Sequence, residues 1–275
     1  MSDFFIRDGL RLAVYDRGNG APVLFQHGLC GDAAQPADVF PYELSARGLT
    51  LECRGHGRSE AGDPARLSIA TFADDIAAWI ESLGVAPLVV GGISMGAAIA
   101  LRLAVTRPDL VKGLVLARPA WFVEAAPDNM AANSVVGDLL ARFAPQEARQ
   151  RFETLGLRRD LETRAPDNLA SLRGFFTREP VAVTAALLTR LSADGPGVTR
   201  EEVAAIKVPT LVIGHGLDIV HPIGHAEALA GTIPGARLAR ITPKAASKEL
   251  YRQNFNAALT RFILETAHEA PVRLA

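Results

Sequence analysis

An apolar run that ends in Gly-x-Ser-x-Gly and continues directly into a second apolar run is the strongest constraint on how this chain can fold. The run spans residues 87–98, PLVVGGISMGAA, with Ser94 at the centre of the motif. A serine between a strand and a helix sits on strained backbone, so Gly92 and Gly96 are needed for the two elements to approach closely. The turn would expose the Ser94 hydroxyl and place the backbone N–H of Met95 at a helix N-terminus, where it can stabilise an oxyanion. The segment predicts a serine nucleophile, because the flanking strand and helix disfavour the alternative of a glycine-rich connection with a solvent serine.

Two further apolar segments end in histidine and glycine. Residues 23–29 read VLFQHGL, and residues 49–59 read LTLECRGHGRS. Together with the serine turn, these segments resemble the α/β-hydrolase superfamily in order and spacing, roughly over residues 4–120 and 205–265. The resemblance implies a second oxyanion N–H from Leu29, and a Gly-His-Gly-x-Ser turn packed beside the nucleophile.

Composition agrees with a soluble enzyme of one catalytic domain. The net charge of -1 and the isoelectric point near 6.6 give no electrostatic reason to expect nucleic acid or an anionic membrane as a partner. No apolar run reaches the roughly 18 to 20 residues of a membrane span, and the first residues lack the order of a signal peptide. We therefore expect a cytoplasmic protein with a small-molecule substrate, reduced thiols at Cys30 and Cys53, and no cofactor or metal. The sequence leaves open whether the protein forms a homodimer.

Alternating β-like and α-like segments predict an α/β fold with a doubly wound, mostly parallel sheet, and the resemblance implies that this sheet is of the α/β-hydrolase type. A helix is expected to open at Thr71, in a capping box with Asp74, and to close at Gly84. Ligands of such sheets bind beyond the carboxyl ends of the strands, where the three motifs fall. The other expected elements are strands at 4–6, 11–16, 22–26, 49–52, 87–91, 112–117, 208–214 and 236–241, and helices at 95–106, from Pro222 and from about 246.

The alternation stops between residues 121 and 200, which predicts a helical cap inserted into a core of residues 1–120 and 201–275. Ten arginines in the interval face ten acidic residues, so the cap carries little net charge. Three residues near the strand ends are candidates for substrate contact. They are Arg118, which follows an apolar strand and has a structural ion pair as its alternative, Trp121, and His27, a position that the family uses structurally. The expected buried positions of the cap are Leu139, Leu140, Phe143, Phe175, Phe176, Val183, Leu187, Leu188 and Leu191.

The acid of a catalytic triad is expected in residues 209–222, PTLVIGHGLDIVHP. This segment resembles the acid strand of the family, with Asp218 where the carboxylate that orients the histidine is found. An aspartate in a local turn is the alternative.

The base departs from the family pattern. Relatives carry Gly-His after the last strand, and alignment through Phe255 places Ala245 at that histidine. A serine needs a partner that takes its proton, so a working enzyme requires a base from elsewhere. His221, three residues after Asp218 and just before a helix, is the best replacement, in an Asp-x-x-His arrangement that resembles the SGNH lipases. A structural histidine at a helix N-terminus is the alternative, and His215 and His225 are weaker candidates.

These residues predict a cofactor-independent serine hydrolase that cleaves a carboxylic ester, thioester or lactone through an acyl-serine intermediate. Ser94 is the expected nucleophile, Asp218 the orienting acid and His221 the base, with Met95 and Leu29 forming the oxyanion hole. Two alternatives stay open: a C–C hydrolase or lyase on the same fold, and a catalytically impaired ligand-binding homologue, suggested by Ala245. The sequence does not name the substrate.

Overall fold

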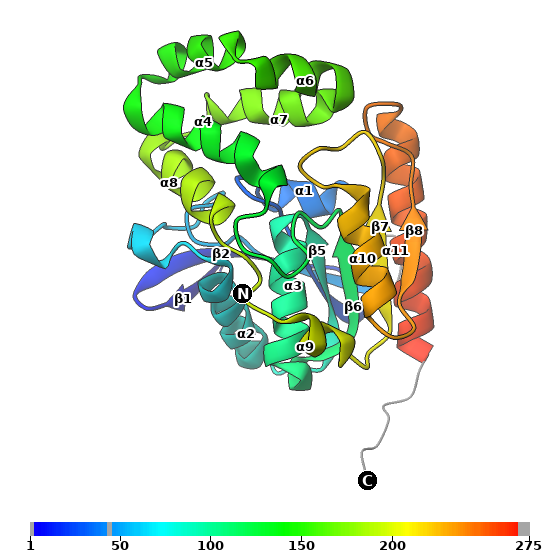
Figure 1. The fold of residues 1–275 in the computed structure, drawn as a ribbon. Helices are drawn as coiled ribbons and strands as arrows, with labels where there is room; N and C mark the ends of the chain where they lie inside the picture. Colours follow the sequence, from blue (N-terminus) through cyan, green and yellow to red (C-terminus); the bar gives the residue numbers. More distant parts are fainter. Residues whose placement is uncertain (1–2, 43–45, 269–275) are drawn as a thin grey trace.

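The computed structural model describes residues 3–42 and 46–268, and this part of the chain is built around one sheet of eight strands. The strand order is β1-β2-β4-β3-β5-β6-β7-β8 (Figure 1). β2 pairs antiparallel with β1 and β4, and the other pairings are parallel. The predicted mostly parallel, doubly wound sheet is therefore confirmed. Its strands are β1 (Phe4–Arg7), β2 (Leu10–Arg17), β3 (Ala21–Gln26), β4 (Ala46–Leu51), β5 (Leu88–Ile93), β6 (Val111–Ala117), β7 (Thr210–Gly214) and β8 (Arg237–Arg240).

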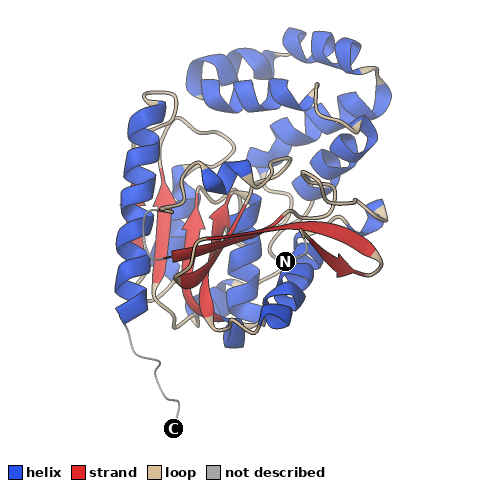
Figure 2. Ribbon diagram, turned by 180° about the vertical axis from the view of Figure 1, so that it is seen from behind, coloured by secondary structure: helices blue, strands red, loops and turns tan. Residues whose placement is uncertain are grey.

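Helices cover both faces of the sheet, because both faces carry apolar side chains that must be buried. One core contains Ile76, Ile99 and Leu229 from helices on the first face. A second core contains Phe255 and Phe262 on the opposite face, where Figure 2 shows the long C-terminal helix running beside the strands. The first face carries α2 (Ile69–Leu83), α3 (Met95–Thr106), α9 (Arg200–Ala204) and α10 (Ile223–Thr232), and the second carries α1 (Ala34–Ala37) and α11 (Lys248–His268). Short 3-10 turns lie at η1 (Pro64–Arg66), η2 (Pro108–Leu110) and η3 (Asp128–Met130).

The start of α2 differs from the prediction. Ser68, rather than Thr71, is the N-cap, and its hydroxyl accepts a hydrogen bond from the backbone N–H of Thr71. The helix therefore begins at Ile69, and Thr71 lies in its first turn, where the Ser68 side chain caps the Thr71 backbone N–H. Gly84 ends the helix in the left-handed conformation at φ 61°, as predicted.

The interval between β6 and β7 is helical, as predicted. Besides η3 and α9, it contains α4 (Ala131–Arg142), α5 (Pro145–Thr154), α6 (Gly156–Arg164), α7 (Pro166–Phe175) and α8 (Val181–Ser192). Figure 1 shows them above the ends of β5 and β6, with α8 nearest to the sheet. The expected buried positions Leu140, Phe176, Leu187, Leu188 and Leu191 are buried, and Leu139, Phe143, Phe175 and Val183 are partly buried. We refer to α4–α8 as the helical insertion.

Among the described helices, none combines the length and the apolar character needed to cross a bilayer.

Candidate active site

Ser94 stands on a sharp turn between β5 and α3. Its backbone has φ 58° and ψ -112°, a conformation that costs energy for any residue with a Cβ. A Cβ on Gly92 would lie 2.5 Å from the carbonyl carbon of Gly96, and a Cβ on Gly96 would lie 2.5 Å from the carbonyl oxygen of Gln26. Both glycines are therefore required for the close passage of strand and helix, as the sequence predicts.

The loop between β7 and α10 brings an imidazole to the Ser94 hydroxyl. His221 Nε2 lies 2.8 Å from Ser94 Oγ. His221 Nδ1 lies 2.9 Å and 3.0 Å from the two carboxylate oxygens of Asp218. Because a lone pair on Nδ1 would be repelled by the carboxylate, the proton belongs on Nδ1, which leaves Nε2 free to accept the serine proton. Serine, histidine and aspartate are thus joined in the order of a catalytic triad.

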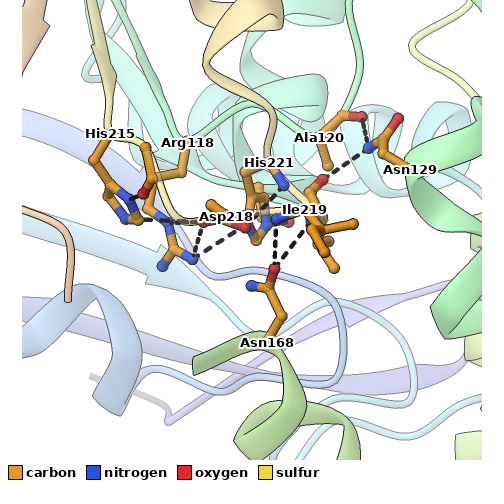
Figure 3. Close-up of polar contacts among 11 residues, drawn as sticks. Arg118, Ala120, Asn129, Asn168, His215, Asp218, Ile219 and His221 are labelled. Carbon is orange, nitrogen blue, oxygen red and sulfur yellow. Dashed lines mark hydrogen bonds and ion pairs between the residues drawn. The ribbon is translucent and has the colours of Figure 1, made fainter. Parts of the chain in front are cut away.

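A buried arginine also holds the Asp218 carboxylate, and its Nη2 lies 3.2 Å from His221 Nδ1 (Figure 3). Arg118 Nη2 donates to Asp218 Oδ2 at 2.6 Å and Nε donates to the same oxygen at 3.1 Å. The Arg118 guanidinium also lies over the Tyr251 ring, 5.8 Å from its centroid. The side chains of Arg118 and Asp218 are 11% and 1% exposed, so their charges neutralise each other in a largely dry site.

These charges set the protonation states of the pair. Burial alone would raise the pKa of the Asp218 carboxyl, but His221 and Arg118 outweigh it and hold the pKa well below its usual range. Burial lowers the pKa of the His221 imidazole below its usual value of 6.5, with Asp218 opposing the shift and Arg118 adding to it. Asp218 is therefore an anion and His221 a neutral base at pH 7.

Two asparagines hold the acid and base loop in place. Asn168 Oδ1 accepts the backbone N–H groups of Ile219 at 2.7 Å and Val220 at 3.1 Å. Asn129 Nδ2 donates to the carbonyl oxygens of Ala120 and Val220, at 2.8 Å and 2.7 Å (Figure 3). Asn168 lies in α7 of the helical insertion, so the insertion directly supports the loop that carries His221.

A cavity of about 110 Å³ opens beside Ser94 and His221. The helical insertion supplies part of its wall. A Cβ on Gly28 would lie 3.3 Å from Ser94 Cβ, so the main chain that leads to Leu29 passes close to the nucleophile. This chain is fixed by Gln35, whose Oε1 accepts the Gly28 N–H at 2.5 Å. The lining residues are Gly28, Leu29, Gln35, Ile93, Ser94, Arg118, Asn133, Asn168, Ser171, Leu172, Phe175, Val220, His221 and Lys244.

The comparison with known proteins agrees with this geometry, since residues 21–247 match the family model of the alpha/beta hydrolase fold. The chain belongs to the alpha/beta hydrolase family. This hydrolase is 31% identical over 240 residues to the Mycobacterium tuberculosis protein named "Putative non-heme bromoperoxidase BpoC", covering 84% of this chain and 89% of that protein. It is 27% identical over 241 residues to the 2-hydroxymuconate semialdehyde hydrolase of Pseudomonas putida, covering 84% and 82%. The esterase EaEST from Exiguobacterium antarcticum shares the fold, with a TM-score of 0.75 at 22% identity over 96% of this chain and 100% of that one.

The position that the family pattern gives to the histidine holds no imidazole in this chain. Ala245, at the expected histidine position, is exposed, whereas His221 reaches Ser94 from the preceding loop. The weaker candidate His215 is buried, with Nδ1 2.5 Å from the Gly216 carbonyl oxygen and Nε2 3.8 Å from Asp218 Oδ2. His225 lies inside α10.

Two residues expected to contact substrate have structural partners instead. His27 is fully buried, and its Nε2 accepts the backbone N–H of Cys53 at 3.0 Å while Nδ1 lies 2.9 Å from the Gly28 carbonyl oxygen. Trp121 is 1% exposed, and its indole N–H donates to the Asp194 carbonyl oxygen at 2.9 Å. The expectation of substrate contact is therefore wrong for both side chains in this conformation, because neither has surface left to offer. Arg118 does line the cavity, but as the partner of Asp218.

The described part of the chain holds no cluster of three or more histidine, cysteine or acidic side chains arranged for a metal ion. Cys30 and Cys53 are free thiols, and burial raises the pKa of Cys30 to about 12. These thiols are protonated at neutral pH and are poor nucleophiles.

Sequence reasoning missed Asn168, Asn129, Gln35 and Lys244. The first three act on backbone groups that lie 51, 91 and 7 residues away. No local pattern marks a side chain whose partner is brought to it by the fold. Lys244 stands beside Ala245 and lines the cavity, so the segment aligned with the histidine of relatives still reaches the site.

Proposed function

We propose that this protein is a cofactor-independent serine hydrolase that cleaves carboxylic esters, thioesters or lactones through an acyl-serine intermediate. The observation that carries the proposal is the 2.8 Å approach of His221 Nε2 to Ser94 Oγ, with His221 Nδ1 held by Asp218. The geometry supplies a nucleophile, a base within hydrogen-bond reach and a group that orients the base.

In the proposed reaction, His221 Nε2 takes the Ser94 proton as Oγ attacks the substrate carbonyl. The backbone N–H groups of Met95 and Leu29 stabilise the resulting oxyanion, because Met95 opens α3 and Leu29 faces the same cavity. Protonated His221 then gives its proton to the leaving alcohol or thiol. Water activated by the same imidazole releases the acid from Ser94.

The buried ion pair of Arg118 and Asp218 supports the base in the proposed reaction. Asp218 stabilises the imidazolium that forms on His221, and Arg118 keeps that carboxylate ionised and fixed. Helices α4–α8 act as a cap that supplies cavity wall through residues such as Leu172 and Phe175. From the sequence we also expect a cytoplasmic location and a small-molecule substrate. The sequence leaves open whether the protein forms a homodimer.

An active-site phosphonate probe tests the proposal. We expect one phosphonyl group per chain, located on Ser94 by peptide mass spectrometry, and no labelling of the Ser94→Ala variant. Gly224→Ala, a change at an exposed helical position with open space around it, serves as the folding-neutral control. Absence of labelling over hours would favour the catalytically silent, ligand-binding alternative and overturn the hydrolase.

A C–C hydrolase is the second candidate, favoured by the 27% identity to the 2-hydroxymuconate semialdehyde hydrolase. Product analysis separates the two reactions. A serine esterase turns over a simple ester and leaves a β-diketone intact, whereas a C–C hydrolase cleaves the diketone to an acid and a ketone.

A further inference from the structure

We propose, on the basis of the hydrolase function proposed above, that the natural substrate carries a carboxylate that binds Lys244 in the cavity beside Ser94. Three observations support this inference: the charges of the cavity wall, an unpaired amide oxygen in that wall, and the small volume of the cavity.

The cavity wall carries a net positive charge when the ion pair of Arg118 and Asp218 is taken as neutral. Arg118 and Lys244 are the two cationic side chains among the fourteen lining residues, and the lining contains no acidic residue. The Arg118 charge is matched by Asp218, which lies behind it at 2.6 Å. The Lys244 ammonium has no carboxylate partner in the described part of the chain, where its nearest aromatic contact is the Tyr251 ring at 6.0 Å. One uncompensated positive charge therefore faces the site.

The position of Lys244 makes this charge more than an ordinary surface feature. Lys244 is partly buried, whereas the neighbouring lysine, Lys248, is exposed at the start of α11. A substrate anion in the cavity would gain a charge-assisted hydrogen bond from the Lys244 ammonium. The same cavity contains Ser94, so an anion on Lys244 would be part of the molecule that reacts.

Asn133 offers a second polar contact in the wall. It is 5% exposed, and its Oδ1 has no hydrogen-bond partner among the described residues. A buried amide of this kind costs free energy until it is paired. Asn133 lines the cavity, and its amide Nδ2 can donate to a carboxylate.

The volume limits the substrate to a compact molecule. The cavity measures about 110 Å³, below the roughly 300 to 1,000 Å³ of common ligand sites. Leu172, Phe175 and Val220 give the wall an apolar portion that suits a short carbon chain. A short ester with a carboxylate at its far end satisfies the charge, the amide and the apolar wall together.

Matched ester pairs test this assignment. Monomethyl glutarate and methyl 5-methylhexanoate have the same shape, but the first ends in a carboxylate and the second in an isopropyl group. Acetoxyacetate and isobutyl acetate place the same difference on the alcohol side. The parent enzyme should prefer the carboxylate member of at least one pair, by about tenfold or more in kcat/KM.

Lysine variants link the preference to one side chain. Lys244→Met should lower kcat/KM for the preferred carboxylate ester by about tenfold more than for its isopropyl partner, and Lys244→Arg should restore most of the preference. Lys248→Met removes a neighbouring exposed charge and should leave both substrates unchanged. Equal losses on both members of each pair in Lys244→Met, or no preference in the parent, would overturn the assignment.

A labelling experiment keeps this inference separate from the hydrolase proposal. Glutarate should slow the reaction of a neutral phosphonate with Ser94 in the parent and lose this effect in Lys244→Met. If Ser94 is labelled and glutarate gives no protection, the carboxylate assignment fails while the serine hydrolase stands. If Ser94 is not labelled at all, both fail.

Discussion

The side-chain oxygen of Asn168 lies 2.7 Å from the backbone nitrogen of Ile219, in the loop between the acid and the base. Asp218 and His221 are three residues apart, so the backbone conformation of the two intervening residues determines how they face each other. Asn168 accepts N–H groups from both intervening residues and is itself 4% exposed. An asparagine of the helical insertion is thus a positioning residue for the proposed triad.

Asn168→Ala should therefore impair catalysis more than binding. We expect kcat to fall about tenfold or more with KM changed less, because two buried N–H groups lose their acceptor and the imidazole shifts away from Ser94. Asn168→Asp keeps an acceptor oxygen and should recover part of the rate. Asn256→Ala, in α11, is the control for loss of an asparagine. A fall in melting temperature in Asn168→Ala with kcat retained would show a structural role alone.

His221 is predicted to be the base. His221→Ala should lose about as much kcat as Ser94→Ala, at least about a thousandfold, since each removes the proton transfer on which attack depends. The double variant should cost little more, because members of one catalytic unit are not additive. Asp218→Asn should be milder than either.

A different pair of results would contradict the assignment of His221 as the base. If His221→Ala keeps most of the activity while Ala245→His raises esterase turnover, the chain is a hydrolase that has lost its base from the position used by relatives. Initial rates on a short-chain ester, measured on all variants at one pH, distinguish the two cases.

Much of the fold and part of the site could be predicted from sequence because the signals are local. A Cβ on Gly92 would meet Gly96 four residues further on, and Asp218 and His221 are three residues apart. The capping prediction failed at Thr71 because two hydroxyl residues three apart can both begin a helix, and in the fold the Ser68 hydroxyl accepts the Thr71 N–H. Trp121 could not be assigned, since its Asp194 partner is 73 residues away.

Gly96 should be required for folding as well as for rate. Gly96→Val would place a branched side chain against the main chain of Gln26, where even a Cβ would lie 2.5 Å from the carbonyl oxygen. We expect the free energy of unfolding to fall by about 3 kcal/mol or more. Gly224→Val, with open space around the site, is the matched control. Denaturant unfolding measures both, and a Gly96→Val protein as stable as the parent would refute the steric reading of the turn.

Arg118 should set the pH range of the enzyme through His221. The base acts in its neutral form, and its pKa lies below the usual 6.5 because burial and, to a smaller extent, the Arg118 charge disfavour the imidazolium. The acidic limb of the kcat/KM profile of the parent should therefore have its midpoint below 6.5, with activity retained as pH rises above it.

Removing the arginine charge should move that limb to higher pH. In Arg118→Met the imidazolium is no longer repelled, so the pKa of His221 rises, and we expect the midpoint to move to higher pH with it. Arg118→Lys, which keeps the charge, should move it less, and Arg107→Met removes a distant arginine whose partners are Glu81 and Asp109. A midpoint that stays in place or falls in Arg118→Met, while kcat declines at every pH, would mean that Arg118 only anchors Asp218 and has no influence on the proton affinity of the base.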